Sequence, residues 1–274
     1  SQENIFLMRN TELVPDAPET FEELVEIGTE LKEEGETSEV LAMAVGQEGE
    51  PFRMNALFTS AGGYLFGQDD TGTWDPSDLG VGSDESIAAM EKIAEYGEAG
   101  EGVLRRSIDT ENDAVLFYEK DAPFFIAGPW NIGDANESGV DYGISPIPGF
   151  EDGGPASPYI GYHAFFVTEG SSNSALAQEF VTNYVTDPDF ILSLYEADPR
   201  TPVQTEALES VSADDPNIAA IAEAGADGMP MPSIPEMGET WEPLGQAQAQ
   251  ALSGEDVREA MEAAHNTIAE QIGG

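Results

Sequence analysis

The seven residues Phe124-Phe125-Ile126-Ala127-Gly128-Pro129-Trp130 are the most informative stretch of this 274-residue chain. Four apolar residues in a row predict a buried strand, and the Gly-Pro pair ends it because proline has no backbone N–H. Residues 111–120, before this strand, predict a helix, whereas residues 131–157, after it, have the glycine, proline and acid content of a loop. Strands that alternate with helices in this way indicate an α/β architecture.

The same alternation extends to both ends of the chain. Thr20 and Glu23 form a capping box for a helix that Gly35 ends, and Ser83 can cap a second helix that runs to about Tyr96. Further strands are expected at residues 40–45, 64–66 and 159–168, and further helices at 52–60, 173–185, 190–196, 236–252 and 255–272, the last capped by Ser253. Residues 67–83 are expected to form a loop, and the prolines of residues 229–235 predict an extended segment.

The chain is strongly acidic. It has 54 Asp and Glu residues against 9 Lys and Arg residues, which gives a formal net charge of −45. This charge excludes nucleic acid and anionic lipid as partners, because proteins bind both through cationic side chains. Acids spread along a whole chain are typical of extreme halophiles, in which salt screens the mutual repulsion. An acidic mimic of nucleic acid is the alternative interpretation.

Length and residue content set further bounds. A chain of 274 residues is expected to form one large or two modest domains. It contains no cysteine, which excludes disulfides, a thiolate nucleophile and a cysteine-ligated metal. The sequence has no apolar run of about 18 residues, the length that a membrane-spanning helix needs, so no membrane span is predicted. A strand-like stretch at residues 5–8, so soon after Ser1, predicts a piece of a longer product whose export signal lies upstream.

Recognisable catalytic motifs are absent from the sequence. His163 and His265 are far apart in the chain and are interpreted as structural, and no metal or cofactor is expected. An acid pair of the glycosidase kind is neither supported nor excluded among so many carboxylates. Phe52, Trp130 and Trp241 stand at the ends of predicted elements with carboxylates nearby, and aromatic faces beside acids suit a sugar, although each ring alone can equally be core.

Seven segments, in order, resemble the periplasmic maltodextrin-binding proteins, within the family 1 extracellular solute-binding proteins of ABC importers. Residues 13–24 resemble the segment LLPNPPKTWEEI, residues 50–52 with 61–66 resemble EPY…DGGYAF, residues 78–81 resemble DVGV, residues 124–130 resemble a strand ending in NGPW, residues 142–148 resemble YGVTVLP, residues 177–184 resemble AKEFLENYL, and residues 231–241 resemble MPNIPQM…W. The resemblance covers essentially the whole chain.

This resemblance implies a two-lobe, type II periplasmic-binding-protein fold in which most of the first lobe is absent. Residues 1–160 and 216–274 would form the second, C-terminal lobe, and residues 161–215 a part of the first, N-terminal lobe. No catalytic residue is implied. The ligand-binding positions of the family fall on Glu3, Glu50, Phe52, Arg53, Trp130, Met231 and Trp241. Phe52 lacks a tyrosine hydroxyl, while Arg53 and Thr110 replace aromatic residues, so the sugar is not identified.

The function implied by the resemblance is non-covalent sugar binding in a cleft between the lobes. The chain would be the extracytoplasmic, solute-binding subunit of an ABC importer, monomeric, anchored to the membrane through a missing N-terminal segment, with permease subunits as partners. Binding would close the lobes about a hinge. Two alternatives remain open at this point: a glycoside hydrolase that uses an acid pair, and a lobe scaffold without sugar binding.

Overall fold

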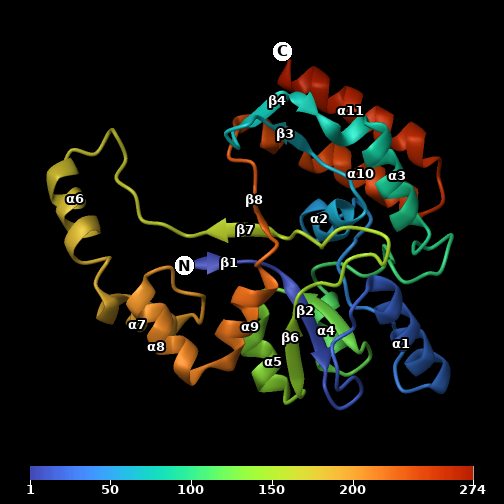
Figure 1. Ribbon diagram of the computed structural model, residues 1–274, viewed down its shortest axis with the longest axis horizontal. Coiled ribbons are helices and arrows are strands. Elements are labelled where there is room, and N and C mark those ends of the chain that lie inside the picture. The colour runs from blue at the N-terminus through green and yellow to red at the C-terminus, as the bar shows by residue number, and fades with distance from the viewer. Residues whose placement is uncertain (274) are drawn as a thin grey trace.

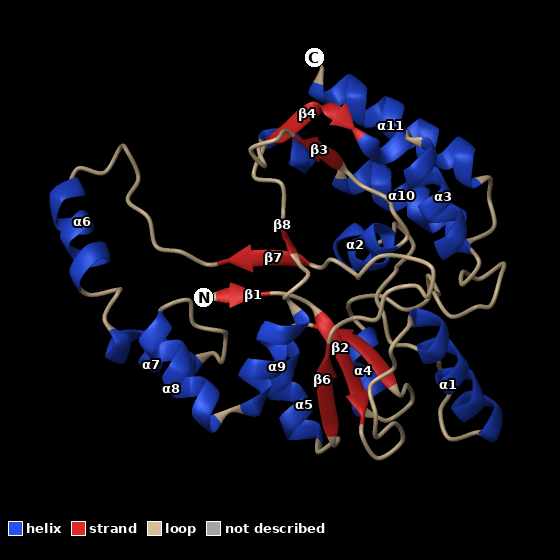
Figure 2. Ribbon diagram, viewed as in Figure 1, coloured by secondary structure: helices blue, strands red, loops and turns tan. Residues whose placement is uncertain are grey.

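The structure is a computed structural model that describes residues 1–273. The chain is a mixed α/β protein in three parts: a central sheet with its covering helices, a layer of helices that contains the C-terminus, and a helical arm at the left of the view (Figures 1 and 2). The helical arm comprises residues 163–214. A small sheet lies where the three parts meet (Figure 2).

The central sheet has three antiparallel strands in the order β5-β2-β6. They are β2 (Phe6–Asn10), β5 (Phe124–Ala127) and β6 (Tyr142–Ser145). The apolar strand predicted from Phe124 to Ala127 is therefore confirmed as β5. The strand predicted at residues 40–45 is wrong, because this buried, extended segment meets β5 only in a single parallel bridge between Ala42 and Phe125.

Both faces of the central sheet are buried. Alternate residues of β2 enter two separate apolar clusters: Leu7 packs in the cluster that contains Phe124, and Met8 in the one that contains Phe125. The helices of this part are α1 (Phe21–Glu34), α4 (Asp113–Tyr118), α5 (Ile132–Ser138) and α9 (Pro216–Ala224). The loop predicted for residues 131–157 is wrong in its first half, because α5 and β6 form there despite many glycines and acids.

The first helix begins and ends as predicted. The Thr20 hydroxyl accepts a hydrogen bond from the Glu23 backbone N–H at 3.1 Å, and Gly35 ends α1 with a φ of 79°. The return half of the capping box is shifted by one residue, because the Glu23 carboxylate accepts from the N–H of Glu19 at 2.6 Å. Ser83 caps the helix α3 (Asp84–Ala94) as predicted.

The second layer of helices shares one apolar cluster with a face of the central sheet and lies above that sheet in the view (Figure 1). Its helices are α2 (Pro51–Ser60), α3 (Asp84–Ala94), α10 (Trp241–Leu252) and α11 (Val257–Ile272). The loop predicted at residues 67–83 is instead the hairpin of β3 (Phe66–Gln68) and β4 (Trp74–Leu79) with a short 3-10 turn, Gly80–Gly82. Asp256, rather than the predicted Ser253, caps α11.

The small sheet has the order β1-β7-β8. Its strands are β1 (Gln2–Glu3), β7 (Tyr159–Tyr162) and β8 (Met229–Pro230). The strand predicted at residues 159–168 is therefore too long, because residues 163–168 run on as a largely exposed segment into the helical arm. The prolines after Met229 leave β8 with two residues at the edge of the sheet, as an extended segment requires.

The helical arm extends away from the other two parts (Figure 1). Its helices are α6 (Ser174–Asn183), α7 (Pro188–Ala197) and α8 (Thr205–Asp214). Every residue of α6 and α7 is at least partly exposed. Large apolar side chains exposed in the arm include Phe165, Phe166, Leu176, Phe180, Tyr184, Leu194 and Val203. The arm therefore carries an apolar surface that residues 1–273 leave uncovered.

Candidate functional site

Three aromatic side chains from three different elements meet beside the small sheet. Phe52 stands in the first turn of α2, Trp241 begins α10, and Tyr159 begins β7. The Tyr159 ring lies 5.9 Å from the Phe52 ring and 6.4 Å from the Trp241 ring, between centroids. Tyr159 is 4% exposed, and burial raises the pKa of its hydroxyl. It supports the two partly exposed rings from behind.

A cavity of about 470 Å³ opens beside Phe52 and Trp241. It is lined by Glu48, Gly49, Glu50, Pro51, Phe52, Trp241 and Glu242. Its size falls in the range of small-molecule sites, and it combines two aromatic faces with three carboxylates. Gly49, at a φ of 79°, allows its loop to touch α10, since a Cβ there would stand 2.0 Å from the Gly245 carbonyl oxygen.

Glu50 holds the start of α2. Its carboxylate accepts a hydrogen bond from the backbone N–H of Arg53 at 2.7 Å, which caps the helix directly before Pro51. Burial raises the pKa of Glu50, although this hydrogen bond and the charge of Arg53 act in the opposite direction. The carboxylate therefore stands at the cavity wall with its orientation fixed by the helix.

The Arg53 guanidinium lies on the inner side of α2. It is 3.2 Å from the carboxylate of Asp113 at the start of α4, and the two side chains are only 9% and 3% exposed. Burial raises the pKa of Asp113, and the charge of Arg53 opposes this rise. Arg53 thus joins α2 to α4 behind the cavity, and ligand binding by its side chain stays a prediction.

Trp130 and Met231 are exposed residues at other element ends. Trp130 lies in the 3-10 turn Pro129–Asn131 after β5, is 39% exposed, and covers Gly128, where a Cβ would stand 2.3 Å from the indole. Met231 follows β8 and is 41% exposed. Both leave an apolar face open to a ligand, and neither is among the residues that line the cavity described above.

Glu3 lies on β1, opposite Gly161 of β7, which is two residues after Tyr159 on the same strand. Its carboxylate pairs with Arg200 and lies 3.0 Å from Nε2 of His163. The structure therefore brings Glu50, Phe52 and Trp241 to one cavity, and places Glu3, Trp130, Met231 and Arg53 outside that wall. Tyr159 is not among the site residues predicted from the sequence. The only local feature that points to it is its place as an aromatic residue directly after Pro158.

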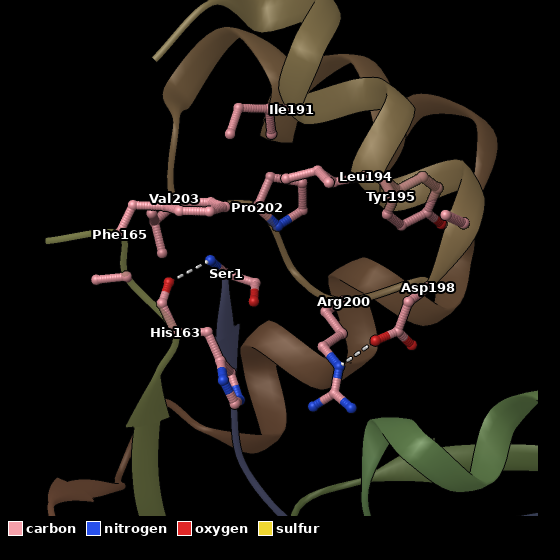
Figure 3. Close-up of a pocket in the computed structure, with 12 residues that line it drawn as sticks. Ser1, His163, Phe165, Ile191, Leu194, Tyr195, Asp198, Arg200, Pro202 and Val203 are labelled. Atoms are coloured by element: carbon pink, nitrogen blue, oxygen red, sulfur yellow. Dashed lines mark hydrogen bonds and ion pairs between the residues drawn. The ribbon is translucent and has the colours of Figure 1, made fainter. Parts of the chain in front are cut away.

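A second cavity, of about 430 Å³, belongs to the helical arm. Figure 3 shows apolar side chains of α7, among them Ile191 and Leu194, facing Phe165 and Val203, with His163 and Arg200 at one end. This cavity combines an apolar wall with the partners of Glu3. It forms part of the uncovered apolar surface of the arm.

The described residues meet the requirements of neither a metal site nor a membrane-spanning helix. Among residues 1–273, no group of three or more His, Cys, Asp or Glu side chains is arranged to hold a metal ion. None of the helices in the described part of the chain is long and apolar enough to cross a lipid bilayer.

A helix start with an aromatic wall and carboxylates suits the non-covalent binding of a small polar ligand. The sequence matches the family described as bacterial extracellular solute-binding protein over residues 1–220, so the chain belongs to this family. This match confirms the family that the motifs indicated. The family and the relatives below are binding proteins and not enzymes, so the glycoside-hydrolase alternative is set aside.

Three relatives illustrate the similarity. The chain is 30% identical over 228 residues to the galactooligosaccharide-binding protein of Bacillus subtilis (strain 168), which covers 79% of this chain and 52% of that protein. It is 27% identical over 247 residues to the maltotriose-binding protein of Pyrococcus abyssi (87% and 51%). It is 27% identical over 276 residues to the maltooligosaccharide ABC transporter solute-binding lipoprotein of Streptococcus pneumoniae R6 (97% and 62%). The chain thus spans about half the length of the curated relatives it matches.

Proposed function

We propose that this chain is part of the sugar-binding subunit of an ABC importer and that its ligand is an oligosaccharide. The observation that carries the proposal is the pair of partly exposed rings, Phe52 and Trp241, that flank the carboxylate of Glu50 around one cavity. Aromatic faces stack on the C–H faces of sugar rings, while carboxylates accept hydrogen bonds from hydroxyl groups. The names of the relatives, which refer to galacto- and maltooligosaccharides, support the same ligand class.

The proposal includes the division into lobes predicted from the sequence. Residues 1–160 and 216–274 would form one lobe and residues 161–215 a part of the other. The packing of α9 on β2 and β6, and the separation of α6 to α8 from the central sheet, support this boundary. The ligand would lie between the lobes, and closure about the small sheet would bury it. Met231, Trp130 and Glu3 would then complete the wall begun by the cavity residues.

The proposed partners follow from the family. An extracellular solute-binding protein of an importer delivers its ligand to permease subunits, so we include these as partners. We also include an extracytoplasmic location and a membrane anchor, for which the lipoprotein relative is the support. A monomer is the oligomeric state we propose. A high-salt environment is proposed on the net charge of −45 alone.

Tryptophan fluorescence of the natural full-length protein, in roughly molar KCl, tests the function. Titration with maltotriose, a galactooligosaccharide and glucose should give a saturable change with an oligosaccharide. Trp130→Ala and Trp241→Ala should each weaken binding about tenfold or more, as expected for the loss of one stacking platform. Trp74→Phe, in the β3–β4 hairpin, is the matched control and should bind normally.

Flat titrations with every sugar, in a sample shown to be folded, would refute the sugar proposal and favour the scaffold without sugar binding. Saturable binding that is unchanged in both Trp130→Ala and Trp241→Ala would instead show that these aromatic side chains are not the binding site.

A further inference from the structure

Each carboxylate oxygen of Glu3 has its own nitrogen partner from a separate segment. Nη1 of Arg200 contacts Oε2, and Nε2 of His163 lies 3.0 Å from Oε1. The side chains of Glu3 and Arg200 are 20% and 23% exposed, whereas that of His163 is 58% exposed. Because solvent weakens exposed ion pairs, the contact with Arg200 is the one that fixes the carboxylate.

Arg200 is itself held from two directions. Its Nε donates to the carboxylate of Asp198 at 2.7 Å, which leaves Nη1 directed to Glu3 (Figure 3 shows Arg200 with Asp198). The planar guanidinium can bind two acceptors in a fixed geometry, which a lysine cannot do. Next to it, the Thr201 carbonyl accepts a hydrogen bond from the backbone N–H of Gln2 at 2.8 Å. The connection between α7 and α8 is therefore attached to β1 through both backbone and side chain.

We propose that Arg200 is a positioning residue that clamps β1 to the helical arm and thereby holds the Glu3 carboxylate in one orientation for sugar binding. This inference rests on the proposed function, because only that function gives Glu3 a sugar to bind. The physical reason is that β1 has only two residues and cannot define the direction of a side chain by its own pairing. Any movement of the arm relative to the central sheet would move Arg200 and, with it, the carboxylate.

Arg200→Met, Arg200→Lys and Glu3→Gln in the natural full-length protein test the inference. Arg200→Met should weaken oligosaccharide binding about tenfold, as for the loss of one charge-assisted hydrogen bond, and Arg200→Lys should recover part of this loss. In the Glu3→Gln background, Arg200→Met should cause no further weakening, because the effect acts through Glu3. Arg258→Met is the matched control, since Arg258 also pairs with two carboxylates, Asp84 and Glu262, but on α11.

A second measurement needs no ligand. Amide hydrogen exchange at Gln2 should accelerate in Arg200→Met, while exchange in β2 and β5 stays as in the wild type. Normal sugar affinity in Arg200→Met, or an equal loss in the Glu3→Gln background, would overturn the positioning role. Unchanged exchange at Gln2 would overturn the clamp. If the wild-type protein binds no sugar, the proposed function and the positioning role both fall, and the exchange result alone decides on the clamp.

Discussion

The buried pair of Arg53 and Asp113 gives the largest single stability effect that we expect. The two side chains are 9% and 3% exposed, and 3.2 Å separates the guanidinium from the carboxylate. Asp113→Ala leaves the charge of Arg53 buried without its partner, which costs about 3 to 5 kcal/mol in comparable pairs. Replacing both, as Arg53→Met with Asp113→Leu, removes both charges and should restore most of the lost free energy of unfolding.

The assay is urea unfolding at one fixed KCl concentration, with the midpoint and slope fitted together. Arg258→Met, at an exposed ion pair on α11, is the matched control and should change the free energy of unfolding by less than about 1 kcal/mol. A loss below about 1 kcal/mol in Asp113→Ala would refute the reasoning, and so would a double variant that is less stable than the single one. Because Arg53 lies in the first turn of α2, Asp113→Ala should also disturb the cavity wall at Phe52.

Three further expectations concern pH, salt and the loop before α2. Burial raises the pKa of Glu50 in the folded protein. Between the pKa of the unfolded chain and this raised pKa, the folded protein keeps a proton that the unfolded chain has lost. The free energy of unfolding therefore falls as the pH rises through this window. Glu50→Gln should remove this part of the pH dependence of urea unfolding, and an unchanged profile would contradict it. The net charge of −45 predicts that the thermal midpoint rises as KCl increases from about 0.1 M to about 2 M, more than in an equally concentrated neutral osmolyte. Gly49→Ala should lower the free energy of unfolding in urea by more than about 2 kcal/mol, because the added Cβ would meet the Gly245 backbone. Gly35→Ala, at the same φ of 79° but with open space around it, is the control and should cost about 1 kcal/mol. Equal losses in the two variants would refute this reasoning.

Elements with a local signal were predicted well. α1 and α3 have a capping side chain and an apolar face, and β5 is a run of apolar residues bounded by Gly128. Elements that depend on distant partners were predicted poorly. Residues 40–45 look like a strand by composition but form only one bridge. Residues 164–168 leave the sheet because, among residues 1–273, no strand pairs with them beyond the backbone contact of His163 with Ser1. β6 forms in a segment of loop composition because it pairs with β2 in the central sheet, and α5 forms there because its Ile132 and Ala135 pack in the apolar cluster that covers one face of that sheet.

The candidate site shows the same division. Trp241, Phe52 and Glu50 could be named from the sequence because they stand at helix starts that resemble a family motif. Tyr159 could not, because its role comes from ring contacts with residues far away in the chain. The partners of Glu3 also lie more than 150 positions from it, and no spacing in the sequence connects them.

The distribution of exposed apolar side chains bears on the proposed division into lobes. Phe166 is 80% exposed and Leu176 is 70% exposed, values that a folded surface seldom shows for several such residues close together. Among the described residues, the helices α2, α3, α10 and α11 show no such excess, since they bury their apolar faces in one cluster. An oligosaccharide site normally encloses most of its ligand, whereas the cavity at Phe52 and Trp241 has one wall. Under the proposed function, further chain of the length that the relatives have would both cover the apolar surface of the arm and supply the wall that faces Phe52 and Trp241.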